Sequence, residues 1–288
     1  MKVLIIGADG MIGHKMAQTF RKNKIDIILN SRFYSNFLRH NFLKTKVFEY
    51  DFLDKKIDNL LAQVNPDYII NAVGKTIRRG ANESSKTKYI NTTLPHEIDF
   101  WCKQNNKRQI HFSSDCVFSG KKGNYFDSDI PDAKDSYGRT KGEGEINSKN
   151  TLTLRSSMIG KEIFNHTELL EWVISNKNKS IKGFDKAIYS GVTTLWMSKT
   201  VFKILKEFPK LNGLYNISSQ PISKFDLIKK INYHFKLNID IVKDSSFSSN
   251  KSLNSSKFFS ETNFDRPNWD DMLSELAFDS QKKNNLYI

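Results

Sequence analysis

The first 30 residues constrain the fold more than any other part of the chain. Residues 3–6 form a continuous apolar run, as expected for a strand buried on both faces of a parallel sheet. Three glycines follow at regular spacing, Gly7, Gly10 and Gly13. Residues 14–22 then carry apolar side chains at helical spacing, and residues 25–29 form a second apolar run. Strand, glycine turn, helix and strand in this order predict a βαβ unit.

The alternation of strands and helices continues along the chain. Further strands are predicted at residues 47–51, 68–73, 109–113, 151–155 and 213–217, and further helices at 53–64, 87–105, 136–147, 168–176, 194–208 and 223–235. This order predicts an α/β fold, a Rossmann-type doubly wound parallel sheet with a smaller C-terminal α/β lobe. We expect one domain at residues 1–155, completed by a helix around 192–208, and a second at 156–288. Residues 243–257, rich in Ser, Asn and Lys, are expected to form a mobile loop.

The glycine turn predicts a dinucleotide site. Without Cβ atoms the backbone can approach a pyrophosphate, and the following helix presents free N–H groups and a positive dipole end. The predicted cofactor contacts in this turn are Gly7, Gly10, Met11, Ile12 and Gly13. The alternative is that the glycines serve only helix–strand packing.

The ends of the next strands refine the cofactor prediction. After the second strand a carboxylate would indicate NAD, whereas this sequence has Ser31 and Arg32, which suit the 2′-phosphate of NADP. NADP(H) is therefore favoured over NAD(H), although Arg32 as a solvated loop residue is the alternative. Since ligands bind at the carboxyl ends of strands in open α/β sheets, five more cofactor contacts are predicted there. They are Asp51, Phe52, Asn71, Ala72 and Val73.

A serine, a tyrosine and a lysine form the predicted catalytic set. Tyr137 and Lys141 stand four residues apart on a predicted helix and so share one face. A free tyrosine titrates near pH ~10, and a nearby ammonium group lowers that pKa toward neutrality. Ser114, at the end of the fifth strand, offers a hydroxyl that can hold a substrate oxygen. The alternative for Tyr137 and Lys141 is an ordinary exposed amphipathic helix.

These motifs together resemble the extended short-chain dehydrogenase/reductase superfamily, and within it the dTDP-4-dehydrorhamnose reductase family of nucleotide-sugar reductases. The resemblance covers residues 1–160. Residues 113–120 read Ser-Ser-Asp-Cys-Val-Phe-Ser-Gly, against Ser-Thr-Asp-Tyr-Val-Phe-x-Gly in the family. Ser114 thus falls on the family's catalytic Thr, and Tyr137 and Lys141 fall on its Tyr and Lys. The resemblance also implies that Asn91 holds a water in a proton relay.

The resemblance implies an NAD(P)-dependent oxidoreductase. It would use NADPH to reduce the C4 keto group of a nucleotide-linked 4-keto-6-deoxy sugar, in deoxysugar and surface polysaccharide biosynthesis. Residues 1–155 would bind NAD(P), and residues 156–288 would bind the substrate. The catalytic residues would be Ser114, Tyr137, Lys141 and Asn91, with Tyr137 and Lys141 also touching the cofactor. The substrate contacts would be Ser114, Asp115, Cys116, Tyr137 and Arg155, with Lys182 and Lys186 as further cations near the diphosphate.

Three other functions compete with this prediction. Nucleotide-sugar 4,6-dehydratases resemble this chain but carry Asp-Glu after the catalytic Thr, where this chain has Asp115 and Cys116. A C4 epimerase would use the same Ser, Tyr and Lys but would normally have an acidic residue after the second strand. Some family members bind NADP as regulatory subunits without turnover, and the intact Ser, Tyr and Lys set argues against that class.

The net charge of +14 permits an anionic partner but does not identify one. Basic residues are spread along the chain, with the densest cluster at residues 75–79, and no zinc-finger or RNA-binding motif accompanies them. Two cysteines, Cys102 and Cys116, suggest neither a disulfide framework nor a metal site. No apolar run is long enough for a signal peptide or a membrane span. We expect a cytoplasmic protein without nucleic-acid or membrane partners, and homodimers are common in the superfamily that it resembles.

Overall fold

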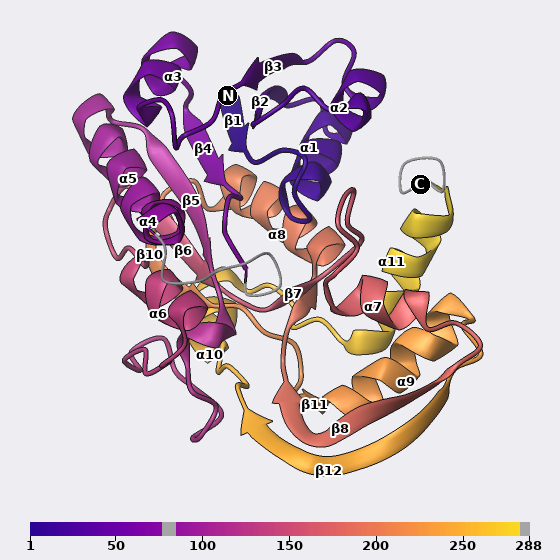
Figure 1. Ribbon diagram of the computed structural model, residues 1–288. Coiled ribbons are helices and arrows are strands. Elements are labelled where there is room, and N and C mark those ends of the chain that lie inside the picture. Colours follow the sequence, from indigo (N-terminus) through magenta and orange to yellow (C-terminus); the bar gives the residue numbers. More distant parts are fainter. Residues whose placement is uncertain (77–84, 283–288) are drawn as a thin grey trace. The chain divides into compact units, whose positions relative to one another are not determined.

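The computed structural model describes residues 1–76 and 85–282, and its chain forms two compact units (Figure 1). The first unit comprises residues 1–113, 134–154 and 198–214. The second comprises residues 114–133, 155–197 and 215–288. Each unit therefore draws on three separate stretches, and the chain passes between the units five times.

The first unit is built on a seven-stranded sheet with the order β10-β6-β5-β4-β1-β2-β3. Its strands are β1 (Lys2–Ile6), β2 (Asp26–Ser31), β3 (Lys46–Glu49), β4 (Tyr68–Asn71), β5 (Arg108–Ser113), β6 (Thr151–Arg155) and β10 (Gly213–Asn216). β1 pairs in parallel with both β2 and β4, and the pairs β2–β3 and β4–β5 are also parallel. Seven strands were predicted from the sequence, and each corresponds to one of these.

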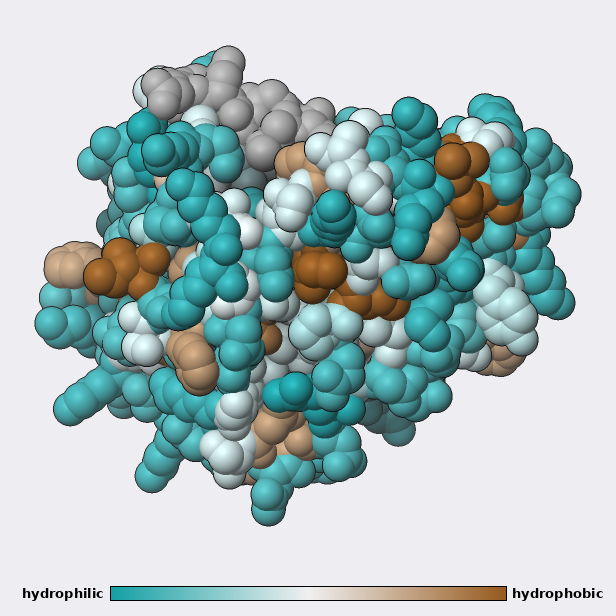
Figure 2. All heavy atoms as spheres, turned by 90° about the horizontal axis from the view of Figure 1, so that it is seen from below, coloured by the Kyte–Doolittle hydropathy of each residue, from teal (hydrophilic) through white to brown (hydrophobic). Residues whose placement is uncertain are grey.

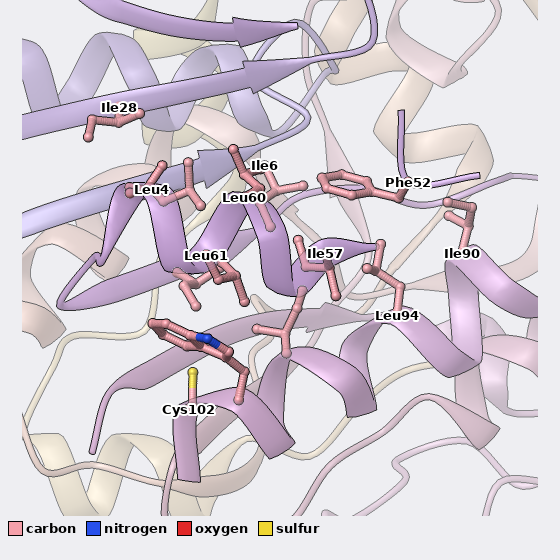
Figure 3. Close-up of a cluster of buried hydrophobic side chains, with 14 residues drawn as sticks. Leu4, Ile6, Ile28, Phe52, Ile57, Leu60, Leu61, Ile90, Leu94 and Cys102 are labelled. Carbon is pink, nitrogen blue, oxygen red and sulfur yellow. The ribbon is translucent and has the colours of Figure 1, made fainter. Parts of the chain in front are cut away.

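Helices cover both faces of this sheet. They are α1 (Gly13–Lys22), α2 (Asn36–Asn41), α3 (Ile57–Val64), α4 (Ser85–Lys88), α5 (Leu94–Asn105), α6 (Ser136–Glu143) and α8 (Thr194–Glu207). On one face, α3 and α5 bury leucines such as Leu61 and Leu94 against Leu4 of β1 (Figure 3). On the other face α1 packs against α8, where the ring centroids of Phe20 and Phe202 lie 5.9 Å apart. The predicted doubly wound α/β sheet is confirmed.

The strand order creates a switch point between β1 and β4. The chain leaves β1 toward one face of the sheet and leaves β4 toward the other, so the two loops diverge at the carboxyl ends of these strands. The helix predicted at residues 87–105 is interrupted by a π-helical turn, η2 (Tyr89–Thr93), between α4 and α5. Such turns are common at functional sites because they displace one residue from the regular helix.

The second unit contains a three-stranded sheet with the order β11-β8-β12 and a short pair, β7 and β9. Its strands are β7 (Met158–Ile159), β8 (Ser180–Tyr189), β9 (Val192–Thr193), β11 (Ile222–Ser223) and β12 (Asp240–Asn250). Its helices are α7 (Leu169–Ser175), α9 (Lys224–Phe235), α10 (Ser256–Thr262) and α11 (Trp269–Lys282), and one short 3-10 turn is η3 (Asp115–Val117).

The prediction of a mobile loop at residues 243–257 is wrong. Most of this stretch belongs to β12, which pairs in parallel with β8, and α10 begins at Ser256. Salt bridges between the two strands support the pairing, with Lys182 3.8 Å from Asp244 and Lys243 3.5 Å from Asp185. Strand pairing thus outweighs the local preference of a Ser- and Asn-rich sequence.

Hydrophilic residues cover most of the face shown in Figure 2, and hydrophobic residues form small separate groups on it. Among residues 1–76 and 85–282, no helix has the length and apolar character that crossing a membrane requires.

Candidate active site

The glycine loop between β1 and α1 is tightly folded on itself. Gly7 has φ +76° and its carbonyl oxygen accepts a hydrogen bond from the Gly10 N–H at 3.0 Å. A Cβ on Gly13 would lie 2.0 Å from the Gly7 oxygen, and a Cβ on Gly7 would lie 2.9 Å from a methyl carbon of Val73. Loop packing therefore explains Gly7 and Gly13.

Gly10 is different from the other two glycines. Within the described part of the chain, a Cβ on Gly10 would meet only the Gly7 oxygen, at 3.3 Å, beyond its own chain neighbours. Its remaining side is open, which is what the close approach of a pyrophosphate requires. The half-buried Met11 and Ile12 follow directly, at the start of α1. This loop fits the phosphates of a dinucleotide.

A carboxylate lies at the end of β2, and it belongs to Asp9 of the glycine loop rather than to a residue of β2. The Ser31 hydroxyl donates a hydrogen bond to Asp9 Oδ2 at 2.6 Å, which brings the glycine loop to this strand end. The preceding Asn30 is buried and its side-chain amide donates to the Tyr50 carbonyl of the neighbouring strand end at 3.0 Å. Arg32 is exposed, with its guanidinium carbon 5.5 Å from the centroid of the Phe33 ring. No motif in the sequence points to Asp9 as a residue of this site.

The other predicted cofactor contacts lie at the ends of β3 and β4. Asp51 Oδ1 accepts a hydrogen bond from the Leu53 N–H at 2.9 Å and so shapes the turn after β3. Phe52 is 6% exposed and belongs to the core cluster between the sheet and α3 (Figure 3).

Residues after β4 lie beside the glycine loop. Asn71 is buried and its Oδ1 accepts a hydrogen bond from the Val73 N–H at 3.3 Å. The Ala72 N–H donates to the Ile6 carbonyl at 3.1 Å, and a Cβ on Gly7 would contact both Ala72 and Val73. The structure thus brings Ala72 and Val73 together with Gly7 at the switch point.

Helix α6 carries Tyr137 and Lys141. Asp135 caps the helix by accepting the Gly138 N–H at 2.9 Å. Lys141 is 4% exposed, and its ammonium group donates to the Phe112 carbonyl of β5 at 2.6 Å. Burial lowers the pKa of Lys141 to about 8, although the nearby Glu145 acts in the opposite direction. Tyr137 is half-buried one turn earlier, on the same helix face.

Asn91 lies in η2 and is held against α6. Its Oδ1 accepts the Lys75 N–H at 2.9 Å, and its Nδ2 donates to the Lys75 carbonyl and to Thr140 Oγ1, both at 3.1 Å. A Cβ on Gly144 would lie 2.0 Å from the Asn91 carbonyl oxygen, so the two segments are in close backbone contact. The side chain therefore packs beside Thr140, the residue that precedes Lys141.

Ser114, Asp115 and Cys116 lie in the second unit. The Ser114 hydroxyl accepts the Cys116 N–H at 3.1 Å and donates to Asp115 Oδ1 at 3.3 Å. Burial and the Asp115 carboxylate raise the pKa of Cys116 to about 12, so this thiol stays neutral at physiological pH. A thiol with so high a pKa is a weak proton donor and is not ionised to act as a base, so it is a poor substitute for a catalytic carboxyl group.

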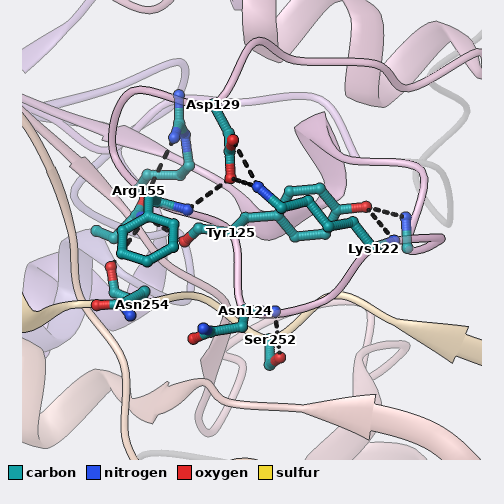
Figure 4. Close-up of polar contacts among 10 residues, drawn as sticks. Lys122, Asn124, Tyr125, Asp129, Arg155, Ser252 and Asn254 are labelled. Carbon is teal, nitrogen blue, oxygen red and sulfur yellow. Dashed lines mark hydrogen bonds and ion pairs between the residues drawn. The ribbon is translucent and has the colours of Figure 1, made fainter.

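The loop that follows these residues is anchored within the second unit (Figure 4). The Tyr125 hydroxyl accepts N–H groups of Gly120 and Lys122 at 3.2 and 3.1 Å. The Asn124 N–H donates to the Ser252 hydroxyl at 2.8 Å. The Phe118 and Tyr125 rings stack with centroids 4.0 Å apart. These contacts fix the backbone that carries Ser114.

The predicted cations of the second unit differ in their surroundings. Arg155 is 1% exposed, with Nη1 3.2 Å from Asn216 Oδ1 and its guanidinium carbon 4.8 Å from the centroid of the Phe118 ring. Lys182 is exposed and paired with Asp244, and Lys186 is exposed on β8. The basic residues Arg78 and Arg79 lie outside the described residues. Nowhere in the described ranges do three His, Cys, Asp or Glu side chains form a group that could hold a metal ion.

One family model matches nearly the whole chain. A family model described as RmlD substrate binding domain matches residues 1–277. A curated dTDP-4-dehydrorhamnose reductase from Aggregatibacter actinomycetemcomitans is 26% identical over 238 residues, which cover 78% of this chain and 76% of that protein.

Solved structures share the fold. A dTDP-4-dehydrorhamnose reductase from Bacillus anthracis, solved in complex with NADP, has a TM-score of 0.79 at 19% identity, covering 97% of this chain and 99% of that one. A UDP-glucose 4-epimerase from Thermotoga maritima, solved with UDP-glucose, has a TM-score of 0.81 at 13% identity, covering 99% of this chain and 100% of that one. Similar folds thus occur in a reductase and in an epimerase, so the fold alone does not distinguish the two activities and the residues of the site must do so.

Proposed function

The chain belongs to the RmlD substrate binding domain family, and on this premise we propose that it reduces the C4 keto group of a nucleotide-linked 4-keto-6-deoxy sugar with NADPH. The observation that carries the proposal is the Tyr137–Lys141 pair on α6. Lys141 is buried and bonded to the Phe112 carbonyl at the carboxyl end of β5, with a pKa lowered to about 8 by burial. It therefore remains mostly charged near neutral pH, one helical turn from a phenol.

The first unit has the features that NADPH needs. The open side of Gly10 would face the pyrophosphate, in a loop whose tight fold depends on Gly7 and Gly13. Arg32 would meet the 2′-phosphate as a bidentate donor. When bound, NADPH supplies a hydride to the C4 carbon of the sugar.

Residues of the chain would donate the proton to the C4 oxygen and then replace it. Tyr137 donates its phenolic proton to the C4 oxygen as negative charge develops there, so it acts as the general acid. The Lys141 ammonium lowers the pKa of the Tyr137 phenol and binds the nicotinamide ribose. Ser114 holds the carbonyl oxygen, and Asn91 supports the return of a proton to Tyr137. Asp115, Cys116 and Arg155 are the proposed substrate-side residues of the second unit.

One observation favours a rival from the same fold. The Asp9 carboxylate at the end of β2 is the kind of group that NAD-dependent epimerases place there, so an epimerase is the second candidate. An epimerase returns its hydride and consumes no cofactor, whereas a reductase oxidises one NADPH for each sugar. A dehydratase is disfavoured because the neutral thiol of Cys116 stands where a carboxylic acid is needed.

The test measures NADPH oxidation with a panel of nucleotide-linked 4-keto-6-deoxy sugars. The loss of cofactor absorbance monitors the reaction. We expect turnover with at least one member, and a loss of about 10²–10⁴-fold for Tyr137→Phe. Tyr233→Phe, which alters an exposed tyrosine of α9, is the matched control and should keep full activity. NADPH binding without oxidation across the panel would instead support a regulatory family member, and sugar interconversion without oxidation would support an epimerase.

The proposal extends to the biological setting. The product would enter deoxysugar and surface polysaccharide biosynthesis, in the cytoplasm, without a nucleic-acid or membrane partner and with a homodimer as the expected assembly.

A further inference from the structure

Asp9 is the only acidic residue of the glycine loop, and its carboxylate is fixed in place. It accepts a hydrogen bond of 2.6 Å from the hydroxyl of Ser31, the last residue of β2. Ser31 is 2% exposed, and its own carbonyl accepts the Tyr50 N–H at 2.9 Å. The carboxylate is therefore anchored on a rigid strand end.

The loop itself is also tied to β2. The Ala8 N–H donates to the Asn30 carbonyl at 2.8 Å, one residue before Asp9 and one residue before Ser31. β1 and β2 are adjacent and parallel, with Ile6 opposite Asn30, so both carboxyl ends reach the same edge of the sheet. These two bonds hold Asp9 where the second strand ends.

The end of β2 is where a Rossmann fold distinguishes its two cofactors. A carboxylate there accepts hydrogen bonds from the ribose hydroxyls of NAD and repels the 2′-phosphate of NADP. Arg32, the next residue after Ser31, acts in the opposite sense because a guanidinium attracts that phosphate. The chain thus places opposite charges on Asp9 and Arg32 next to Ser31.

We infer that Asp9 is a specificity-determining residue, whose carboxylate weakens the binding of the 2′-phosphate and so sets the ratio of the NADPH and NADH affinities. Ser31 serves as the positioning residue for the Asp9 carboxylate. This inference rests on the proposed function, because it concerns the cofactor of the same site. It predicts a modest preference for NADPH in the unaltered protein and a stronger one once the charge of Asp9 is removed.

The test measures binding rather than turnover. Dissociation constants for NADPH and NADH are determined by calorimetry for the unaltered protein and for Asp9→Asn, which keeps an oxygen that can accept the Ser31 hydroxyl. The pair 2′,5′-ADP and 5′-AMP, which differ only in the 2′-phosphate, is measured in the same way. We expect Asp9→Asn to shift both affinity ratios toward the phosphorylated ligand by about tenfold or more.

Asp26→Asn is the matched control. Asp26 is an exposed residue at the opposite end of β2, roughly 17 Å from Ser31 at ~3.3 Å per residue, so its removal changes the net charge equally without touching the site. We expect its affinity ratios to match those of the unaltered protein. Should Asp9→Asn fold poorly, Asp9→Ser removes the same charge with a smaller side chain and carries the same expectation.

The outcomes separate the inference from the proposed function. If the unaltered protein binds both dinucleotides but Asp9→Asn leaves the ratios within twofold, Asp9 does not set specificity. Equal shifts of the affinity ratios in Asp9→Asn and Asp26→Asn would also overturn the inference, because the change in net charge alone would then explain them. A protein that binds neither dinucleotide would overturn the proposed function, and the inference with it.

Discussion

Lys141, the proposed partner of Tyr137 in catalysis, is buried at a cost in stability. The residue is 4% exposed, and burial lowers the pKa of its ammonium group from 10.5 to about 8. The charged form is therefore less favourable in the folded protein than in the unfolded chain. That difference corresponds to at most about 3 kcal/mol, since each unit of pKa is about 1.4 kcal/mol.

Replacing Lys141 should consequently remove activity without weakening the fold. We expect Lys141→Met to abolish turnover and to raise the free energy of unfolding near pH 7 by up to about 3 kcal/mol. Between pH about 8 and 10.5 the unfolded chain binds more protons at this site than the folded protein. The stability of the unaltered protein therefore rises with pH across this window, and the advantage of Lys141→Met should disappear.

Urea unfolding at pH values from 7 to about 10.5 measures this effect. Lys103→Met, which replaces an exposed lysine of α5, is the control and should show no such pH dependence. A Lys141→Met protein that is less stable than the unaltered one near neutral pH would contradict the explanation.

At the scale of an element, the glycine loop combines two separate requirements. We expect Gly13→Ala to destabilise the protein by about 3 kcal/mol or more, because its Cβ would lie 2.0 Å from the Gly7 oxygen. We expect Gly10→Ala to cost about 1 kcal/mol or less, since its Cβ would need to displace that oxygen only slightly from 3.3 Å. The same substitution should weaken NADPH binding at least about tenfold, because the methyl group faces the pyrophosphate.

Thermal unfolding and NADPH titration of the two variants separate these requirements. Gly10→Ala with unchanged affinity would mean that the cofactor does not approach this residue.

The central strands β1, β2 and β4 of the first unit are predictable from sequence because burial on both faces requires a nearly continuous apolar run. This signal is absent in β12, where most side chains are exposed and the partner strand β8 supplies the pairing. Likewise, the glycine, Ser114, Tyr137 and Lys141 motifs are visible in the sequence, but the contact of Ser31 with Asp9, 22 residues earlier, is not. That contact follows from the order of the strands in the sheet. Local sequence patterns do not encode this order.

On the scale of the whole molecule, the first unit cannot be cut out as one continuous segment. α8 and β10 follow residue 155, although Phe202 packs on Phe20 and β10 pairs with β6 in the first unit. We expect a fragment of residues 1–155 to show no cooperative unfolding transition and no NADPH binding, because one helix face and one sheet edge would be uncovered. A chain that ends at residue 282 keeps every described element and is the control.

Circular dichroism during thermal unfolding, with NADPH titration, provides the measurement. A fragment 1–155 that unfolds cooperatively and binds NADPH would show that α8 and β10 are dispensable.

The five passages of the chain between the units also bear on how the protein is made. During synthesis the ribosome must release residue 216 before the sheet of the first unit can gain its last strand, β10. Residues 114–133 emerge before their anchor, because Asn124 and Tyr125 bond to Ser252, which is translated 128 residues after Asn124. The nascent chain therefore carries Ser114 on a loop without its anchor until Ser252 has emerged, so reductase activity should arise only on chains that include Ser252.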